Sequence, residues 1–155
     1  MKRLLVCVLL AACAKPVPVA APVTLFRDLT APIGSTTRGG PYDMAGNWQV
    51  QAAYPGGLFD AGDGVVLDFA ADGTGVLNGL PLQVVRPNRW RVAGVDYWVL
   101  WVDDDFRTAV IGTPSGAFGW IMDRPGAASA DRTRAARDIL DFSGYDLGRL
   151  QGSGT

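Results

Sequence analysis

Short apolar and β-prone runs alternate with turn residues along most of the chain from Asn47 onward. The dipeptides Asp72-Gly73, Pro87-Asn88 and Ser115-Gly116 supply the turn chemistry between some of these runs. We therefore predict eight strands, over 47–54, 65–70, 75–78, 82–86, 90–93, 97–103, 107–112 and 117–123. The links between them are too short for the crossover helices that a parallel sheet needs. The pattern thus favours an all-β fold, an eight-stranded up-and-down antiparallel β-barrel.

One helix is predicted after the last strand, over about 129–143. Ser129 or Asp131 would cap its start, and Gly144 would end it. Its apolar positions recur at three- and four-residue steps on one face: Ala128, Ala135, Ile139 and Phe142. We expect this helix to pack outside the barrel and residues 151–155 to be a disordered tail.

The first 41 residues differ from the rest in composition. Residues 1–12 combine a Lys2-Arg3 start with an apolar run that is too short to span a bilayer, which is typical of a secretory signal peptide. The segment Leu10-Ala11-Ala12-Cys13 resembles a bacterial lipobox, which implies that Cys13 becomes the lipidated first residue of the mature chain. An ordinary cleaved signal with an incidental cysteine is the alternative.

A lipid on Cys13 would place the protein at a membrane of the cell envelope. Lys15, rather than Asp, stands two places after Cys13, and the sorting pattern of enterobacterial lipoproteins then favours the outer membrane, facing the periplasm. Residues 13–41 are Pro-rich and irregular, and we expect them to act as a tether. The folded domain is predicted over 42–150.

The chemistry that the chain can perform is limited by its composition. The 155 residues include no His, and all 15 acidic residues are Asp. Without His, Ser-His and Cys-His catalysis and the usual zinc sites are excluded. With a formal net charge of −1, the chain lacks the excess of Lys and Arg with which proteins bind the phosphates of nucleic acid. We therefore expect no catalytic residues, no cofactor, no metal and no nucleic-acid partner.

Two acidic stretches are the candidate metal ligands. Asp103, Asp104 and Asp105 are consecutive, and three adjacent carboxylates in a hairpin do not converge on one ion. The stretch from Asp60 to Asp63 lacks the spacing and the distal Glu of an EF-hand loop. Both stretches are predicted to be solvated turns.

Three motifs in order resemble the lipocalin family, and in particular its bacterial outer-membrane lipoproteins. Gly46-Asn47-Trp48 opens the first strand, Trp101–Arg107 lies between the sixth and seventh strands, and Trp120–Arg124 ends the eighth. The structural residues that the resemblance implies are Gly46, Trp48, Asp105, Phe106 and Arg124. Asp104 and Phe106 depart from the family's Thr and Tyr at these places, and the barrel is shorter than in most members.

The resemblance also implies how one end of the barrel is closed. In the family, the first-strand Trp packs against the last-strand Arg, which here would be Trp48 and Arg124. A guanidinium over an indole gains about 0.5–2 kcal/mol, and its remaining donors can bind backbone carbonyls of the N-terminal segment. We expect this pair to be structural.

Side chains alternate along a strand, so these motif residues predict an interior face in steps of two. For the sixth strand two registers are possible, and we assign Trp98, Leu100 and Val102 to the outer face, where they could receive the helix. Phe106 is placed inward with the seventh strand. The predicted ligand-binding lining is aromatic and uncharged: Val50, Ala52, Tyr54, Tyr97, Val99, Trp101, Thr108, Val110, Phe118, Trp120 and Met122.

Such a lining suits one acyl chain or a similar apolar molecule. The predicted function is the transport or storage of a small hydrophobic ligand, such as a fatty acid (palmitate, for example) or a lysophospholipid, in the cell envelope. The alternative is a structural or interaction lipoprotein whose barrel is filled by its own side chains and whose function lies on its loops.

Overall fold

The computed structural model of the protein describes residues 23–152. The predicted signal peptide over 1–12, the predicted lipidation site Cys13 and the first part of the predicted tether lie outside the described residues, as do residues 153–155.

All eight predicted strands are present, with small differences at their ends. The elements in chain order are α1 (Pro41–Met44), β1 (Gly46–Ala53), β2 (Gly64–Phe69), β3 (Thr74–Leu77), β4 (Leu80–Arg86), β5 (Arg89–Val92), β6 (Val95–Val102), β7 (Thr108–Gly112), β8 (Gly119–Asp123), α2 (Ala130–Phe142), η1 (Leu147–Arg149) and β9 (Gln151–Gly152). Residues with positive φ sit in the hairpin turns, among them Gly73, Asn88 and Gly116, where the dipeptides of the sequence predict them.

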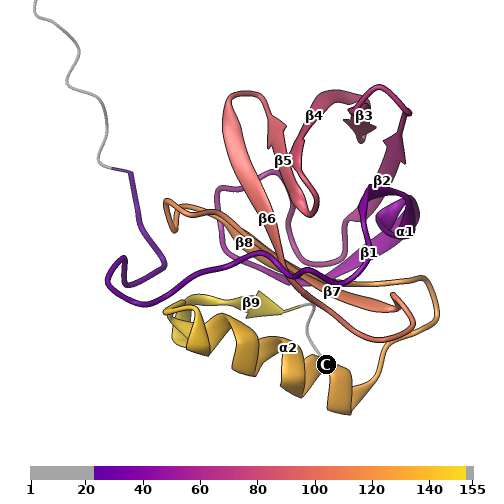
Figure 1. Cartoon of the computed structure of the whole chain (residues 1–155). Helices are drawn as coiled ribbons and strands as arrows, with labels where there is room; N and C mark the ends of the chain where they lie inside the picture. Colours follow the sequence, from indigo (N-terminus) through magenta and orange to yellow (C-terminus); the bar gives the residue numbers. More distant parts are fainter. Residues whose placement is uncertain (1–22, 153–155) are drawn as a thin grey trace, which may run out of the picture.

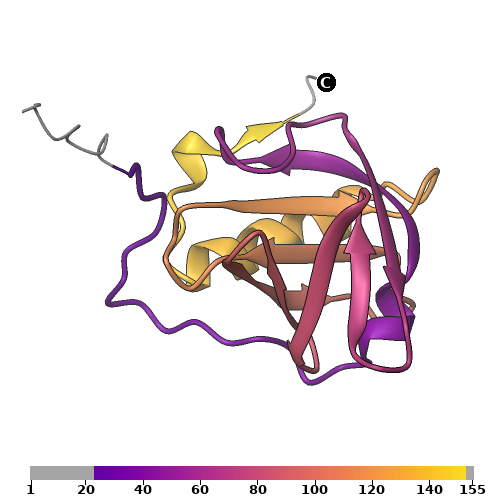
Figure 2. The ribbon, with the colours of Figure 1, turned by 90° about the horizontal axis from the view of Figure 1, so that it is seen from above.

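Strands β1 to β8 form a closed antiparallel barrel. Each strand pairs with the next along the chain from β2 to β8, β8 pairs with β1, and β1 pairs with β2 to close the ring. Figure 1 shows β2 to β6 standing above β1, β7 and β8, and Figure 2 gives the view from above. The predicted up-and-down barrel is confirmed, and closure leaves its strands without a long free edge.

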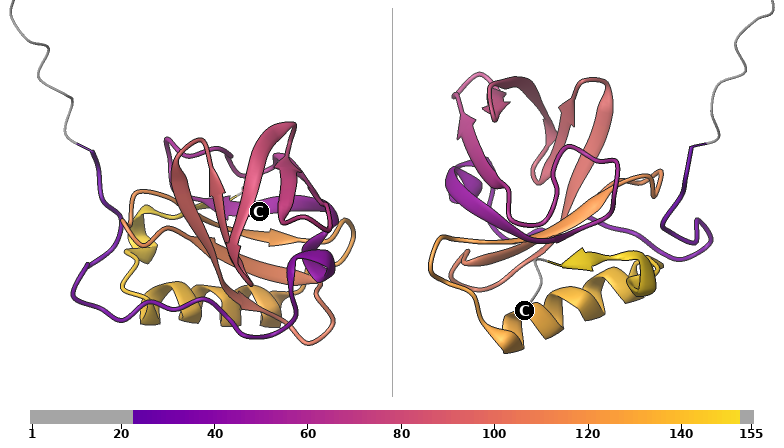
Figure 3. Two further views of the ribbon diagram at one scale, coloured as in Figure 1. Left: turned by 45° about the horizontal axis from the view of Figure 1, so that its top comes forward. Right: turned by 180° about the vertical axis from the view of Figure 1, so that it is seen from behind.

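Helix α2 covers the outer face of β6, β7 and β8, which confirms that it packs outside the barrel (Figure 3). Its buried face differs from the predicted one, because Ala136 and Leu140 are buried while Phe142 is 71% exposed. The predicted stop is present, since Gly144 has a φ of +85° and a Cβ there would lie 2.5 Å from the Cβ of Ala31.

The barrel wall separates two hydrophobic cores. The inner cluster fills the barrel: Met44, Trp48, Val50, Ala53, Phe59, Val65, Leu67, Phe69, Leu77, Leu82, Trp90, Val92, Tyr97, Val99, Val102, Ala109, Ile111, Trp120 and Met122. The outer cluster lies between the sheet, α2 and the terminal segments: Phe26, Ala52, Tyr54, Leu100, Val110, Ile121, Ala136, Leu140, Tyr145 and Leu150. Because α2 covers β7 and β8 from outside, both faces of these two strands are buried.

Residues 23–40, predicted as part of the tether, are irregular but pack against the barrel. Phe26 is buried, and its backbone N–H donates to the carbonyl of Gly116 at 2.7 Å. The N–H of Thr36 donates to the carbonyl of Val99 on β6, also at 2.7 Å. This segment therefore belongs to the folded domain, which extends further toward the N-terminus than predicted.

The tail also differs from the prediction at its first two residues. Gln151 and Gly152 form β9, which pairs with Ala53 and Ala52 of β1. Strand β2 pairs with β1 only from Gly46 to Gln49, so the last residues of β1 have an edge available on that side. Strand β9 occupies this edge and satisfies backbone groups that would otherwise be unpaired.

Candidate functional site

One end of the barrel is closed by Arg124 and Trp48, as the family resemblance implies. The guanidinium carbon of Arg124 lies 3.9 Å from the centroid of the Trp48 ring. Its nitrogens donate to the carbonyls of Asp43 at 2.9 Å, Ala45 at 2.8 Å, Asn47 at 3.2 Å and Phe106 at 3.2 Å. These bonds join the α1 segment, β1 and the β6–β7 loop into one closed end.

The loop between β6 and β7 is ordered by Asp103, which the sequence analysis placed in a solvated turn. Asp103 is buried, and its carboxylate accepts hydrogen bonds from the backbone N–H groups of Arg107 and Thr108, the latter at 2.7 Å. Burial pushes the pKa of Asp103 upward, but the hydrogen bonds from Thr108 and Arg107 outweigh it and leave the pKa below its usual value. The expected solvated turn is therefore wrong for Asp103.

The motif residues Asp105 and Phe106 have different surroundings. Asp105 is exposed, and its carboxylate pairs with Arg107 at 2.8 Å. Phe106 has a φ of +54°, and its ring packs against Gly39 and the inner cluster. Phe106 contributes to the closed end through its backbone, because its left-handed conformation turns its carbonyl toward Arg124. The hydroxyl of the Tyr that the family has at this place is not needed for that bond.

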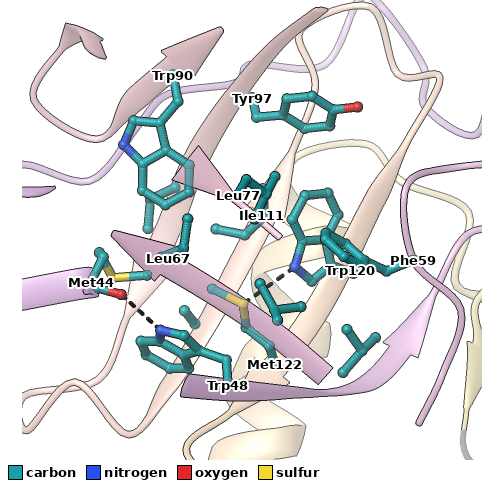
Figure 4. Close-up of a cluster of buried hydrophobic side chains, with 14 of the residues drawn as sticks. Met44, Trp48, Phe59, Leu67, Leu77, Trp90, Tyr97, Ile111, Trp120 and Met122 are labelled. Atoms are coloured by element: carbon teal, nitrogen blue, oxygen red, sulfur yellow. Dashed lines mark hydrogen bonds between the residues drawn. The ribbon is translucent and has the colours of Figure 1, made fainter. Parts of the chain in front are cut away.

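Six of the predicted lining residues belong to the barrel interior. Val50, Tyr97, Val99, Trp120 and Met122 are members of the inner cluster, and Phe118 packs against it. The rings contact one another, with centroids 5.5 Å apart for Tyr97 and Trp120. Figure 4 shows Tyr97, Trp120 and Met122 among the side chains that converge from different strands. The interior is therefore aromatic, as the sequence predicts.

The other five predicted lining residues do not face the interior. Ala52, Tyr54, Trp101 and Val110 belong to or pack against the outer cluster. On β1 and β6 the cause is a β-bulge, one between Val50 and Ala52 and one between Val99 and Trp101. A bulge inserts one residue and reverses the alternation beyond it, so Ala53 and Val102 point inward instead.

On β7 the predicted register is wrong by one residue. Ala109 and Ile111 belong to the inner cluster, and Thr108 faces α2. The Thr108 hydroxyl hydrogen-bonds the buried carboxylate of Asp123, and Arg132 of α2 donates to Thr108 Oγ1 at 2.8 Å. Burial raises the pKa of Asp123, partly offset by the hydrogen bond from Thr108. Thr108 thus joins the helix to the barrel and lies outside the inner cluster.

The other end of the barrel, its mouth, is closed by the loop over residues 54–63. Phe59 of this loop is buried, and its ring meets that of Trp120 edge-on, with centroids 5.3 Å apart (Figure 4). Gly57 lies against the ring of Phe118. Trp90, Tyr97 and Trp120 retain only 1–2% exposure. A ligand-sized void would expose these rings inside the barrel, so the barrel's own side chains fill it in this state.

Sequence reasoning missed the interior residues of β2 to β5 and the plug residue Phe59. The inner wall also contains Val65, Leu67, Leu77, Leu82 and Trp90. Alternation along β2 and β5 carried this signal, because each has a buried residue at every second position. Phe59 carried no periodic signal, since it lies in a loop.

Within residues 23–152, no three Asp or Cys side chains gather closely enough to hold a metal ion. None of the helices in this part of the chain has the length and apolar character needed to cross a membrane.

Part of the chain is similar in sequence to known proteins. Residues 77–153 match the family model described as a lipocalin-like domain, a segment that begins at the last residue of β3 and includes α2 and β9. The chain is also similar to temperature-induced lipocalin-1 of Arabidopsis thaliana, with 34% identity over 55 residues. That match spans 36% of this chain and 30% of the plant protein.

Solved structures share the fold. Apocrustacyanin C1 superposes with a TM-score of 0.53 at 14% identity, covering 73% of this chain and 79% of that chain. Lobster apocrustacyanin A1 gives 0.50 at 17%, covering 72% and 79%. Insecticyanin from the tobacco hornworm Manduca sexta gives 0.52 at 14%, covering 81% and 84%. The family model thus matches slightly less than half of the chain. The solved structures show that the chain shares their barrel fold.

Proposed function

We propose that the barrel binds a small hydrophobic ligand, such as a fatty acid or a lysophospholipid, for transport or storage, and that it is not an enzyme. The observation that carries this proposal is the inner wall, which is apolar and aromatic from the closed end to the mouth. Eight-stranded barrels of this type are wide enough to hold one small ligand. Each ligand CH2 group buried there would contribute about 0.8 kcal/mol.

Entry of a ligand requires the mouth to open. Phe59 is held by ring packing against Trp120, whereas the two ends of its loop are fixed by backbone bonds, including Gly62 N–H to the Val50 carbonyl at 2.8 Å. Gly56 and Gly62 have positive φ and can change conformation at little steric cost. The loop can therefore release Phe59 while its ends stay attached, and a ligand takes the place of the ring.

Two adjacent alanines provide a matched test. Ala53 faces the interior, and Ala52 faces outward, into a cleft of about 650 Å³ between β1, β8 and α2. We expect the full chain, freed of bound lipid, to bind 11-(dansylamino)undecanoic acid saturably. Ala53→Phe should weaken binding at least about tenfold by filling the interior, whereas Ala52→Phe should preserve it.

The alternative outcomes of this test are distinct. Weakening by Ala52→Phe alone would place the ligand in the outer cleft and contradict the proposal. Absence of saturable binding to the wild-type chain would contradict it entirely. Far-UV circular dichroism of both variants verifies that each is folded.

The proposal includes a location: a lipid-anchored protein of the cell envelope, of the bacterial outer-membrane lipoprotein type, facing the periplasm. Its support is the lipobox-like segment that ends at Cys13. In a Gram-negative host fed an alkyne analogue of palmitate, the chain should be labelled, and Cys13→Ala should lose the label. Cys7→Ala is the control and should keep it. Equal labelling of both variants would contradict anchoring at Cys13.

A second candidate function is a filled barrel that acts through its loops. The low exposure of Trp90, Tyr97 and Trp120 favours it. The same dansyl titration separates the two functions, since a barrel that keeps its own side chains in place binds no probe. Capture of a protein partner by cross-linking to the loops would then support the second candidate.

A further inference from the structure

The three tryptophans of the inner cluster differ in how their indole N–H groups are satisfied. Trp48 Nε1 donates to the Met44 carbonyl at 2.8 Å. Trp120 Nε1 lies 3.3 Å from the sulfur of Met122. Trp90 Nε1 is buried and has no hydrogen-bond partner within residues 23–152. Figure 4 shows both bonds as dashed lines and none at Trp90. A buried donor without an acceptor is unfavourable, so this group is available to an acceptor that a ligand brings.

The surroundings of Trp90 are uncharged. Its ring lies 5.5 Å from that of Phe69, and Tyr97 is its direct partner in the β5–β6 ladder. The buried charged residues of the described chain lie elsewhere: Asp103 in the β6–β7 loop, Asp123 beneath α2, and Arg27 beside Ser143. A carboxylate brought to Trp90 would lose its hydration without meeting a cation, which is costly. A neutral acceptor avoids this cost.

A row of rings leads from the mouth toward β5, the strand that contains Trp90. Phe59 contacts Trp120, Trp120 contacts Tyr97 at a centroid distance of 5.5 Å, and Tyr97 stands opposite Trp90 on the neighbouring strand. Figure 4 shows Nε1 of Trp90 on the side of its ring away from Tyr97. An acyl chain that displaces Phe59 and follows this row must therefore pass the Trp90 ring to reach the N–H.

We propose that Trp90 is the polar recognition point of the barrel interior and that the ligand is a neutral lipid with a carbonyl oxygen within its chain, such as a ketone or an ester. This inference rests on the proposed binding of a small hydrophobic ligand, and within that class it favours neutral lipids over fatty acids. Trp90 donates to the carbonyl oxygen, and the aromatic wall packs against the chain on either side. The position of the carbonyl along the chain then determines affinity.

Isomeric ketones test this directly, because they share composition and have closely similar hydrophobicity. The tridecanones with the carbonyl at carbons 2, 4, 6 and 7 are used to displace N-phenyl-1-naphthylamine from the wild-type chain. A neutral hydrogen bond changes affinity by about 2- to 12-fold, so one isomer should bind about fivefold more tightly than the weakest. Trp90→Phe should abolish this spread.

Trp120→Phe is the matched control, because the same change inside the same barrel removes an N–H that already has a partner. It should weaken all isomers by one common factor and keep their spread. At pH 8, methyl dodecanoate should also bind more tightly than dodecanoate. Equal affinity of all isomers in the wild-type chain, or tighter binding of dodecanoate, would overturn the inference. Failure of the naphthylamine probe itself to bind would instead contradict the proposed function.

A second measurement does not depend on the folding of Trp90→Phe. Among the five indole N–H signals of the 15N-labelled wild-type chain, the preferred tridecanone should move one strongly downfield, and tridecane should not. No difference between ketone and alkane at any indole signal would contradict the assignment.

Discussion

At the closed end of the barrel, Arg124 donates hydrogen bonds to the carbonyls of Asp43, Ala45 and Phe106, whereas at the mouth Phe59 meets Trp120 ring to ring. Hydrogen bonds are directional and are lost if the chain shifts by an ångström. Ring packing is non-directional by comparison and can be replaced by the packing of another apolar group. The comparison explains how one barrel can be sealed at one end and open to a ligand at the other.

The two ends also differ in buried charge. The carboxylate of Asp103 and the guanidinium of Arg124 lie at the closed end, and Asp123 immediately precedes Arg124. The contacts of Phe59 and Phe118 at the mouth are with rings and with Gly57. Changes of pH should therefore act on the buried contacts of the closed end much more than on the ring packing of Phe59.

The largest expected effect comes from breaking the closed end at Arg124. Arg124→Ala removes the bonds to carbonyls and the contact with Trp48, and should lower the free energy of unfolding by about 3 kcal/mol. Arg124→Lys keeps a cation near the Trp48 ring but loses the planar guanidinium that bonds several carbonyls at once. It should lower the free energy of unfolding by about half as much. Urea unfolding measures both. A cost for Arg124→Ala below that of Arg124→Lys would contradict this account.

The second effect concerns the two buried carboxyls, whose pKa values shift in opposite directions. The lowered pKa of Asp103 means that its charged form stabilises the fold at neutral pH, and that this contribution is lost as pH falls below the unfolded-state pKa and through the folded one. Asp103→Asn should cost about 2 kcal/mol at pH 7. In acid, the free energy of unfolding of Asp103→Asn should approach that of the wild type.

Asp123 is the matched counterpart, because its raised pKa disfavours the charged form in the folded state. The stabilisation from its protonated form is fully present below the unfolded-state pKa and is lost as pH rises through the folded pKa. Asp123→Asn should therefore leave stability at pH 7 unchanged or raise it, by at most about 1 kcal/mol. Urea midpoints between pH 3 and 7 compare the variants, and equal costs for both at pH 7 would contradict the assigned directions.

At the mouth we expect a smaller effect on stability than at Arg124. Phe59→Ala removes the ring from Trp120, but the loop can relax around the gap, so the cost should be about 2 kcal/mol, below the roughly 3–5 kcal/mol of a Phe→Ala change at a site that cannot relax. Association of N-phenyl-1-naphthylamine should become faster in stopped-flow measurements. Phe142→Ala, at an exposed ring on α2, is the control and should change neither quantity. An association rate unaffected by Phe59→Ala would show that ligands do not enter past this ring.

Much of the fold was predictable because it depends on local signals. The eight strands follow from apolar runs between turn residues, and Gly144 ends α2 as its position predicts. The contact of Trp48 with Arg124 follows from the family resemblance. The inward positions of β7 were not predictable, because all five of its residues are buried, including its one polar residue, Thr108.

The sequence by itself thus determined the order and approximate ends of the eight barrel strands, and the uncharged character of the interior, since these depend on composition and on neighbouring residues. Only the tertiary structure decided which side chains line the barrel. The bulges after Val50 and Val99 reverse the alternation on β1 and β6, and such bulges arise where strands must bend to fit their neighbours. The unpartnered N–H of Trp90 is likewise a property of the closed barrel, because an acceptor is present or absent only once all eight strands are in place.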